Sequence, residues 1–99
     1  MTLEQAFQRQ ALTNAQAAMT LHGAPTKRLV QTLELRGGVE TARELIGKRR
    51  LSDGFDVLRR CRRLDLSLEA LVIQGKFGAL FTDEESNLCL EVLMEAGFF

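Results

Sequence analysis

Cys61 is the side chain in this chain with the clearest potential for chemistry, because it lies in a five-residue run, 59–63, whose other members are all arginines. Four neighbouring positive charges favour the thiolate, so a sulfur that reached solvent could act as a nucleophile or a redox group. No base accompanies it at a recognisable spacing. Cys89, the only other cysteine, is 28 residues away, and neither has a close-spaced partner with which to bind a metal. We therefore expect two reduced, mainly structural cysteines, as in a cytosolic protein.

The other candidate acid–base groups also have structural interpretations. His22, the only histidine, lies at the expected end of a helix beside a glycine, where capping or plain exposure accounts for it. The acids at 83–85 stand at an expected helix start, where the helix dipole favours them. Asp65 precedes another helix start, and we expect it to accept hydrogen bonds from backbone N–H groups in that turn. The sequence has no phosphate loop, nucleophile elbow or metal-binding helix pattern. We predict no catalytic, metal-ligating or cofactor-binding residue, and a protein that is not an enzyme.

The charges of the chain are divided into two halves that a net charge of zero conceals. Residues 27–63 carry 11 Lys and Arg against 5 acids, a balance of +6. Residues 64–99 carry one base, Lys76, against 7 acids, a balance of −6. Such a molecule can dock an anionic partner, a cationic partner or a second copy of itself.

The arginines of residues 59–63 have two interpretations. They can form a solvated helix face that pairs with Asp56, Asp65 or Glu69, or they can form an interface, because the planar guanidinium donates several hydrogen bonds at once. We predict an interface that docks an acidic surface of a protein partner. The predicted partner-binding residues are Arg43, Lys48, Arg49, Arg50, Arg59, Arg60, Arg62 and Arg63.

A nucleic-acid partner is the alternative. The expected helices over 26–35 and 39–48 are joined through Gly37-Gly38 and can be interpreted as a helix-turn-helix whose basic residues contact phosphates. These basic residues are Lys27, Arg28, Arg36, Arg43, Lys48, Arg49 and Arg50. Any small helical bundle contains two helices joined by a glycine turn, however. The acidic residues 64–99 would repel a nucleic-acid backbone, and residues 39–48 contain no Asn or Gln with which to contact base edges.

Length and composition indicate one helical domain over residues 1–99. The chain has 45% hydrophobic and 26% charged residues with a single proline, which is typical of a globular protein with a core of its own. No apolar stretch approaches the roughly 18 residues that span a bilayer, and no basic segment followed by an apolar run opens the chain, so we expect a cytosolic protein. The six aromatic residues are all Phe, and the absence of Tyr and Trp makes single-stranded nucleic acid a poor partner.

Capping and periodicity patterns predict a compact all-α bundle of about six short helices. Capping boxes at 2–5 and 82–85 begin the first and last of them, and Gly37-Gly38 ends the second. Ser67 is expected to cap a fifth, almost wholly apolar helix, which we therefore place at the centre of the bundle. Ser52-Asp53 is expected to cap the fourth helix. The expected helices run from Thr2 to Leu21, Thr26 to Leu35, Val39 to Lys48, Ser52-Asp53 to about Arg63, Leu68 to Gln74 and Thr82 to Gly97.

Two stretches leave the choice between core and surface open. The fourth helix is expected to bury Phe55 and Leu58, together with Cys61 or Arg62. The two phenylalanines at 98 and 99 either pack over the fifth and sixth helices as part of the core, which we expect, or form an exposed apolar patch that binds a partner or a second copy. In the latter case Phe98 and Phe99 are the contacts of a homodimer. Residues 77–81 pose the same choice.

Several separated blocks of sequence together resemble a known family. They are Gly37-Gly38-Val39-Glu40-Thr41-Ala42, Ser52-Asp53-Gly54-Phe55, the run from Arg63 to Val72, the run from Leu80 to Glu85, and Gly97-Phe98. In order and spacing they are similar to a group of small stand-alone bacterial proteins of about this length, over most of residues 24–98. The resemblance implies a small helical protein but no activity, because none is attached to that family. Where the family has an aromatic and an acidic residue after Leu58, this chain has Arg59-Arg60, so a shared surface there would be unusually basic.

Overall fold

The computed structural model describes residues 1–99 and contains helices but no strand. This confirms the predicted all-α class, with a compact bundle of about six helices. Two short 3₁₀ helices, η1 and η2, connect the later α-helices. The elements are α1 (Leu3–His22), α2 (Lys27–Arg36), α3 (Gly38–Gly47), α4 (Phe55–Arg60), η1 (Leu64–Leu66), α5 (Leu68–Val72), η2 (Gly75–Leu80) and α6 (Asp83–Glu95).

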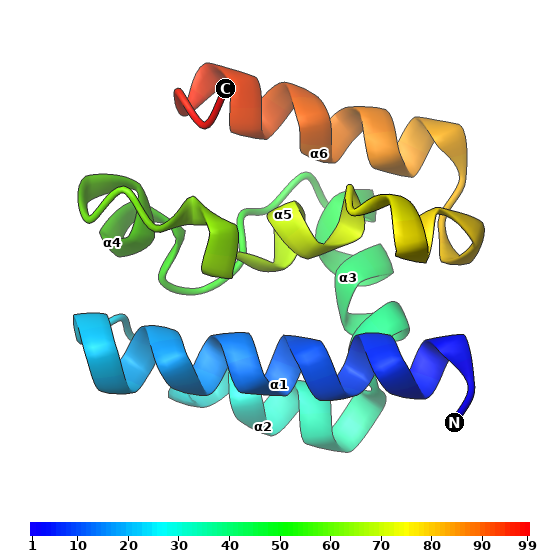
Figure 1. The fold of residues 1–99 in the computed structure, drawn as a ribbon, viewed down its shortest axis with the longest axis horizontal. Coiled ribbons are helices and arrows are strands. Elements are labelled where there is room, and N and C mark those ends of the chain that lie inside the picture. Colours follow the sequence, from blue (N-terminus) through cyan, green and yellow to red (C-terminus); the bar gives the residue numbers. More distant parts are fainter.

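The helices form three layers (Figure 1). The long α1 and its neighbour α2 make one outer layer, α6 makes the other, and α3, α4 and α5 lie between them. All five residues of α5 are buried, which confirms the prediction that this apolar helix is central. None of the helices combines the length and the apolar character that a membrane span requires.

The helix starts follow the capping patterns of the sequence. Thr2 accepts a hydrogen bond from the backbone N–H of Gln5, whose side chain accepts one in return, and Thr82 and Glu85 repeat this arrangement at α6. Ser67 caps α5 through the N–H of Ala70. These contacts satisfy N–H groups that have no partner within a helix, so they fix where each helix begins.

The core consists of two clusters of buried side chains. In the first, the ring of Phe7 meets the rings of Phe77 and Phe81 edge to face, with ring centres 5.2 Å apart in each pair. Residues 77–81 therefore supply core contacts. The second cluster joins Phe55 and Leu58 to Leu93, so that α4 and the end of α6 pack on the same apolar centre.

Three expectations about the middle of the chain are wrong. Helix α4 ends at Arg60 instead of Arg63, so Cys61 and Arg62 fall in a turn and are exposed rather than buried. Ser52 does not cap α4, because its side chain hydrogen-bonds to Glu69 instead. Helix α5 ends at Val72, two residues early, and η2 takes the chain onward to α6.

The end of the chain does not join the core as expected. Phe98 is 36% exposed and Phe99 is 70% exposed, although their rings contact each other edge to face. The left-handed Gly97 ends α6 and turns the backbone so that the N–H of Phe98 bonds to the carbonyl of Leu93. Both phenylalanines thus lie on the surface, at the same end of the molecule as α4 (Figure 1).

Candidate functional site

The end of α3 and the segment after it separate two hollows in the surface. Arg50 and Leu51 of this segment line both hollows, as does Leu45 of α3. We call residues 49–51 the ridge. On one side of the ridge the lining is mainly apolar, and on the other it is mainly polar.

The apolar groove lies between α3 and α6, with α5 beneath it. Its cavity volume is about 190 Å³. Buried Ala42, Leu68 and Val72 contribute to its lining, together with the half-buried Leu88 and Val92 of α6. Pockets of this kind, with apolar walls and a few polar groups, are where proteins hold apolar ligands or side chains.

Glu69 lines the groove from α5 and is only 7% exposed. It accepts two hydrogen bonds from Ser52, at 2.8 Å from the backbone N–H to Oε2 and at 2.6 Å from the hydroxyl to Oε1. Burial raises the pKa of the Glu69 carboxyl above its ordinary value, while the bonds from Ser52 act in the opposite direction. Because Ser52 directly follows the ridge, this buried carboxylate holds the ridge against α5.

Cys89 lies beside the same groove from α6 and is buried. Burial, with the nearby carboxylates of Glu69 and Glu85, raises the pKa of its thiol to about 12. The thiol is therefore protonated at neutral pH and packs as a small apolar group. Neither cysteine forms a disulfide, and no cluster of three His, Cys, Asp or Glu side chains capable of holding a metal ion is present.

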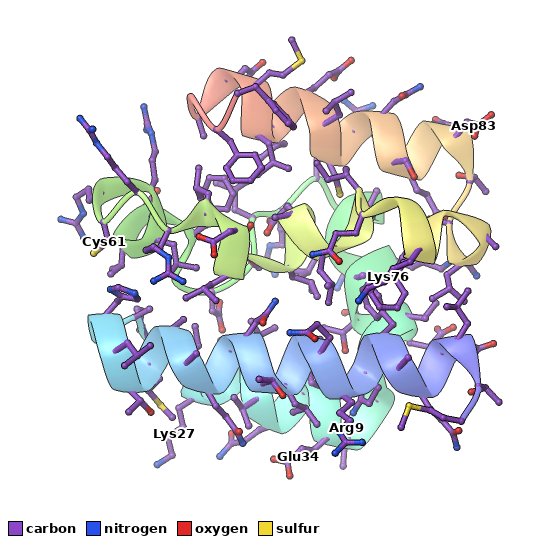
Figure 2. All side chains as sticks on the ribbon, in the orientation of Figure 1. Arg9, Lys27, Glu34, Cys61, Lys76 and Asp83 are labelled. Carbon is purple, nitrogen blue, oxygen red and sulfur yellow. The ribbon has the colours of Figure 1, made fainter.

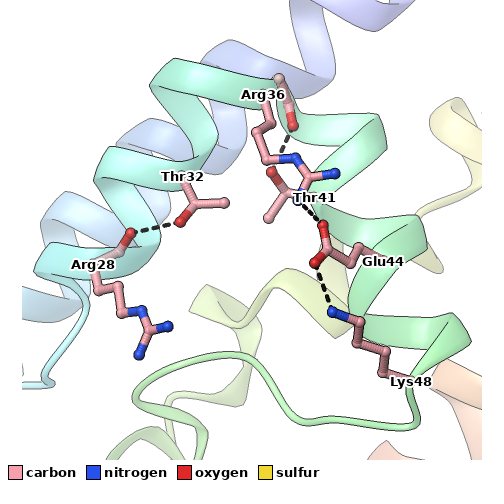
Figure 3. A network of polar contacts seen from close by, with 7 residues as sticks. Arg28, Thr32, Arg36, Thr41, Glu44 and Lys48 are labelled. Atoms are coloured by element: carbon pink, nitrogen blue, oxygen red, sulfur yellow. Dashed lines mark hydrogen bonds and ion pairs between the residues drawn. The ribbon is translucent and has the colours of Figure 1, made fainter.

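The polar hollow lies between α2, α3 and the ridge, with a volume of about 360 Å³. Arg28 and Arg50 line it, and neither has a carboxylate within ion-pair distance. Glu44 also lines it, but that acid pairs with Arg36 and, at 2.9 Å, with Lys48 (Figure 3). These partners and Arg50 lower the pKa of Glu44, the hydrogen bond from Lys48 being the largest cause. The hollow therefore presents two guanidinium groups that form no ion pair within the protein.

Arg49, on the ridge, has a left-handed backbone with a φ of 53°. Two hydrogen bonds close the end of α3, one from the N–H of Arg49 to the carbonyl of Ile46 and one from the N–H of Arg50 to that of Leu45. This is the helix ending in which glycine is usual, because a side chain at the left-handed position costs about 1 kcal/mol. At this position the protein has an arginine, whose side chain is exposed.

The arginines of α4 end their helix in the same way. Arg62 has a φ of 57°, and the N–H groups of Arg62 and Arg63 bond to the carbonyls of Arg59 and Leu58. Arg59, Arg60 and Arg62 are exposed and make no ion pair, while Cys61 between them points away from the body of the molecule (Figure 2). We call residues 59–62 the α4 cluster.

Three of the eight predicted partner-binding residues form ion pairs with acids of the same chain. Arg43 lies 3.4 Å from Glu85 and donates to the carbonyl of Leu80, so it ties α3 to the start of α6. Lys48 pairs with Glu44 as described. Arg63 pairs with Asp65 at 3.0 Å, so Asp65 contacts an arginine and not the turn backbone as expected. The five that remain free are Arg49, Arg50, Arg59, Arg60 and Arg62.

The two charged halves of the chain meet at few points. Of the four ion pairs, those of Arg43 with Glu85 and of Arg63 with Asp65 join the basic and the acidic half. The imidazole of His22, the only histidine, lies 3.5 Å from the guanidinium of Arg63. His22 forms no ion pair with a carboxylate. Most of the opposite charges thus remain available at the surface.

Sequence reasoning missed the roles of three residues of this site, Arg28, Ser52 and Glu69. Arg28 appeared only as part of a possible helix-turn-helix, and its place beside Arg50 depends on the packing of α2 against α3. Ser52 and Glu69 were assigned to a cap and an ion pair. One feature of the sequence could have identified Glu69, namely that it is a single acid in an otherwise apolar helix.

Comparisons with models of protein families, with curated proteins and with solved structures find no match to this chain.

Proposed function

We propose that this protein is a small binding protein, an adaptor, regulator or inhibitor, that docks an acidic surface of a protein partner through its ridge and the α4 cluster. It acts by binding and not by catalysis. Its two free cysteines fit a reducing compartment, and we place it in the cytosol.

The observation that carries the proposal is the pair of left-handed arginines. Arg49 and Arg62 each occupy a position where glycine would cost less. Strained backbone of this kind is concentrated at functional sites, where the side chain is needed despite its cost to stability. In both places that side chain is an arginine without an ion pair inside the protein.

The surroundings of the ridge favour a protein partner over a nucleic acid. The ridge borders an apolar groove, and an apolar centre beside charged residues is the usual arrangement of a protein–protein interface. In the helix-turn-helix interpretation α3 would supply the contacts to DNA, yet Arg43 and Lys48 of that region already pair with Glu85 and Glu44. The α4 cluster, which borders neither hollow, would contribute long-range attraction and a faster association rate.

The test is native mass spectrometry of the tagged protein recovered from its own host, with and without nuclease treatment. We expect a partner protein that survives nuclease. Reversing two charges on the ridge, Arg49→Glu with Arg50→Glu, should remove it. The matched control, Arg59→Glu with Arg60→Glu, makes the same change of charge in the α4 cluster and should weaken the complex less.

Other outcomes would overturn the proposal. Nucleic acid that is retained by the wild type and lost from either double variant would assign the protein to the alternative class, a nucleic-acid-binding regulator. Its binding would also fall steeply with salt, because phosphate contacts release counterions. A bare homodimer that Phe98→Ser and Phe99→Ser disrupt would place the interface at the end of α6.

A further inference from the structure

We infer that the docking segment of the partner carries an acidic side chain next to a large apolar side chain, the acid entering the polar hollow and the apolar group the groove. This inference rests on the proposed function and names the chemistry that its site would accept. The two hollows share Leu45, Arg50 and Leu51, so one short segment that crosses the ridge contacts both.

The polar hollow selects for an anion. Arg28 and Arg50 enter it from different elements, and both are exposed and without an ion pair. In Figure 3 no dashed line joins the guanidinium of Arg28 to the other residues drawn, while Glu44 is held between Arg36 and Lys48. Asp53, which also lines the hollow, is the one acid there without such a partner. A carboxylate between two guanidinium groups accepts several charge-assisted hydrogen bonds.

The groove selects for an apolar group. Its volume of about 190 Å³ is somewhat larger than that of an engineered apolar cavity of about 150 Å³ that binds benzene, so a leucine or phenylalanine side chain fits it. The one buried acid at its base, Glu69, already accepts two hydrogen bonds from Ser52. An entering side chain therefore needs no polar group to satisfy the groove.

The charges around the groove give the segment its direction. Glu91 and Glu95 line the α6 side, whereas Arg49 and Arg50 line the ridge side. An acid placed over α6 would be repelled, and an acid placed across the ridge would be attracted. The acidic side chain must consequently lie on the far side of the ridge from α6.

Both contacts are needed for useful affinity. Ion pairs of exposed arginines are weak because water screens them, so the carboxylate alone would bind poorly. The apolar group supplies the contact that excludes water, and the carboxylate decides which apolar segments bind.

The test uses N-acetyl-glutamyl-phenylalanine amide as the probe and follows the ¹⁵N-labelled protein by NMR. Two control peptides each remove one feature, glutaminyl in place of glutamyl and alanine amide in place of phenylalanine amide. We expect shifts at the amides of Thr32, Leu45 and Leu51, and an affinity about tenfold lower for either control peptide. Arg28→Gln should reproduce the loss seen with the glutaminyl peptide, and Lys27→Gln, an exposed neighbour outside the hollow, should bind as the wild type does.

Equal affinity for the glutamyl and glutaminyl peptides, or equal effects of Arg28→Gln and Lys27→Gln, would overturn the inference. If the natural complex still depends on Arg49 and Arg50 in that case, the proposed function stands and only the chemistry assigned to the partner fails. Residues 95–99 of the chain itself combine an acid with exposed phenylalanines. A dimer in light scattering that both Arg28→Gln and Phe99→Ser abolish would show that a second copy occupies the site, and would overturn the assignment to a separate partner.

Discussion

The ridge and the α4 cluster are built alike but border different surroundings. Each contains an arginine with a left-handed backbone just past the last residue of a helix, and the same pair of hydrogen bonds closes both helices. The α4 cluster is the denser of the two in sequence, yet it lines neither hollow. The ridge has fewer arginines but stands between a polar hollow and an apolar groove. The density of a charge run therefore says little about the surface it forms, because a binding site also needs concave, partly apolar surroundings.

The two regions also differ in how they are held. A buried carboxylate, Glu69, fixes the ridge through Ser52, whereas the only ion pair near the α4 cluster is the exposed one between Arg63 and Asp65. Removing these supports should affect the two regions very differently.

The largest effect is expected from Glu69→Ala. The variant leaves the N–H and hydroxyl of Ser52 without their acceptor in a buried place, which should lower the free energy of unfolding by about 3 kcal/mol. Urea denaturation measures the change. Ser52→Ala, the matched control, removes only the hydroxyl bond and should cost about 1 kcal/mol. Equal stability of Glu69→Ala and wild type would mean that Glu69 does not support the ridge.

Replacing the left-handed arginines separates backbone strain from side-chain function. Arg49→Gly and Arg62→Gly should each raise the free energy of unfolding by about 1 kcal/mol, because glycine adopts this backbone without strain. Only Arg49→Gly should weaken binding of the partner strongly. Arg49→Ala, which keeps the strain and removes the guanidinium, should show the weaker binding without the gain in stability. If glycine stabilises neither position, the backbone there is not strained.

A smaller change in stability is expected as the pH rises, and we expect it to come from Glu69. Because the folded protein raises the pKa of this carboxyl above its ordinary value of 4.5, the folded state holds its proton at pH values where the unfolded state has lost it. The stability that the protonated carboxyl contributes is therefore full below the ordinary pKa and is lost as pH rises through the raised one.

Urea melts of the His22→Gln background, which lacks the only imidazole, can follow this fall. Glu69→Gln in the same background should flatten it, since an amide does not titrate. The thiol of Cys89, with a pKa of about 12, contributes nothing in this range. If stability still falls with rising pH in the Glu69→Gln variant, groups other than Glu69 cause the fall.

The smallest effect is expected near the α4 cluster. Asp65→Asn breaks the exposed pair with Arg63, and water screens such pairs, so urea melts should not resolve a change in stability. Arg63→Gln, which removes the other partner of this pair and also the contact of Arg63 with His22, is the variant with which Asp65→Asn is compared. If Asp65→Asn lowered the free energy of unfolding as much as Glu69→Ala, the two regions would not differ in how they are held.

Local patterns made much of the fold predictable. The capping boxes at the starts of α1 and α6 and the cap at Ser67 each involve residues three positions apart, and their hydrogen bonds formed as the sequence indicated. The apolar character of residues 68–72 also correctly placed α5 at the centre. The end of α4 was harder to predict, because an arginine, Arg62, occupies the left-handed position where a glycine would have marked the stop.

The candidate site was only partly predictable. Arg49 and Arg50 were expected to bind a partner, and they are free and lie beside two hollows. Arg43, Lys48 and Arg63 were expected to do the same, but each forms an ion pair with an acid of the same chain. A charge run in the sequence does not reveal which of its members will meet a carboxylate after folding.

By itself the sequence determined that this protein is helical, where most of its helices begin, which of them lies at the centre, and that its charges are divided between two halves. Those properties follow from side chains within a turn or two of one another and from the total of apolar and charged residues. The tertiary structure alone decided that Arg28 and Arg50 line one hollow, that Ser52 reaches Glu69 across 17 positions of the chain, and that Phe98 and Phe99 stay at the surface. These outcomes depend on how the helices pack, because packing brings together groups whose spacing in the sequence carries no local pattern.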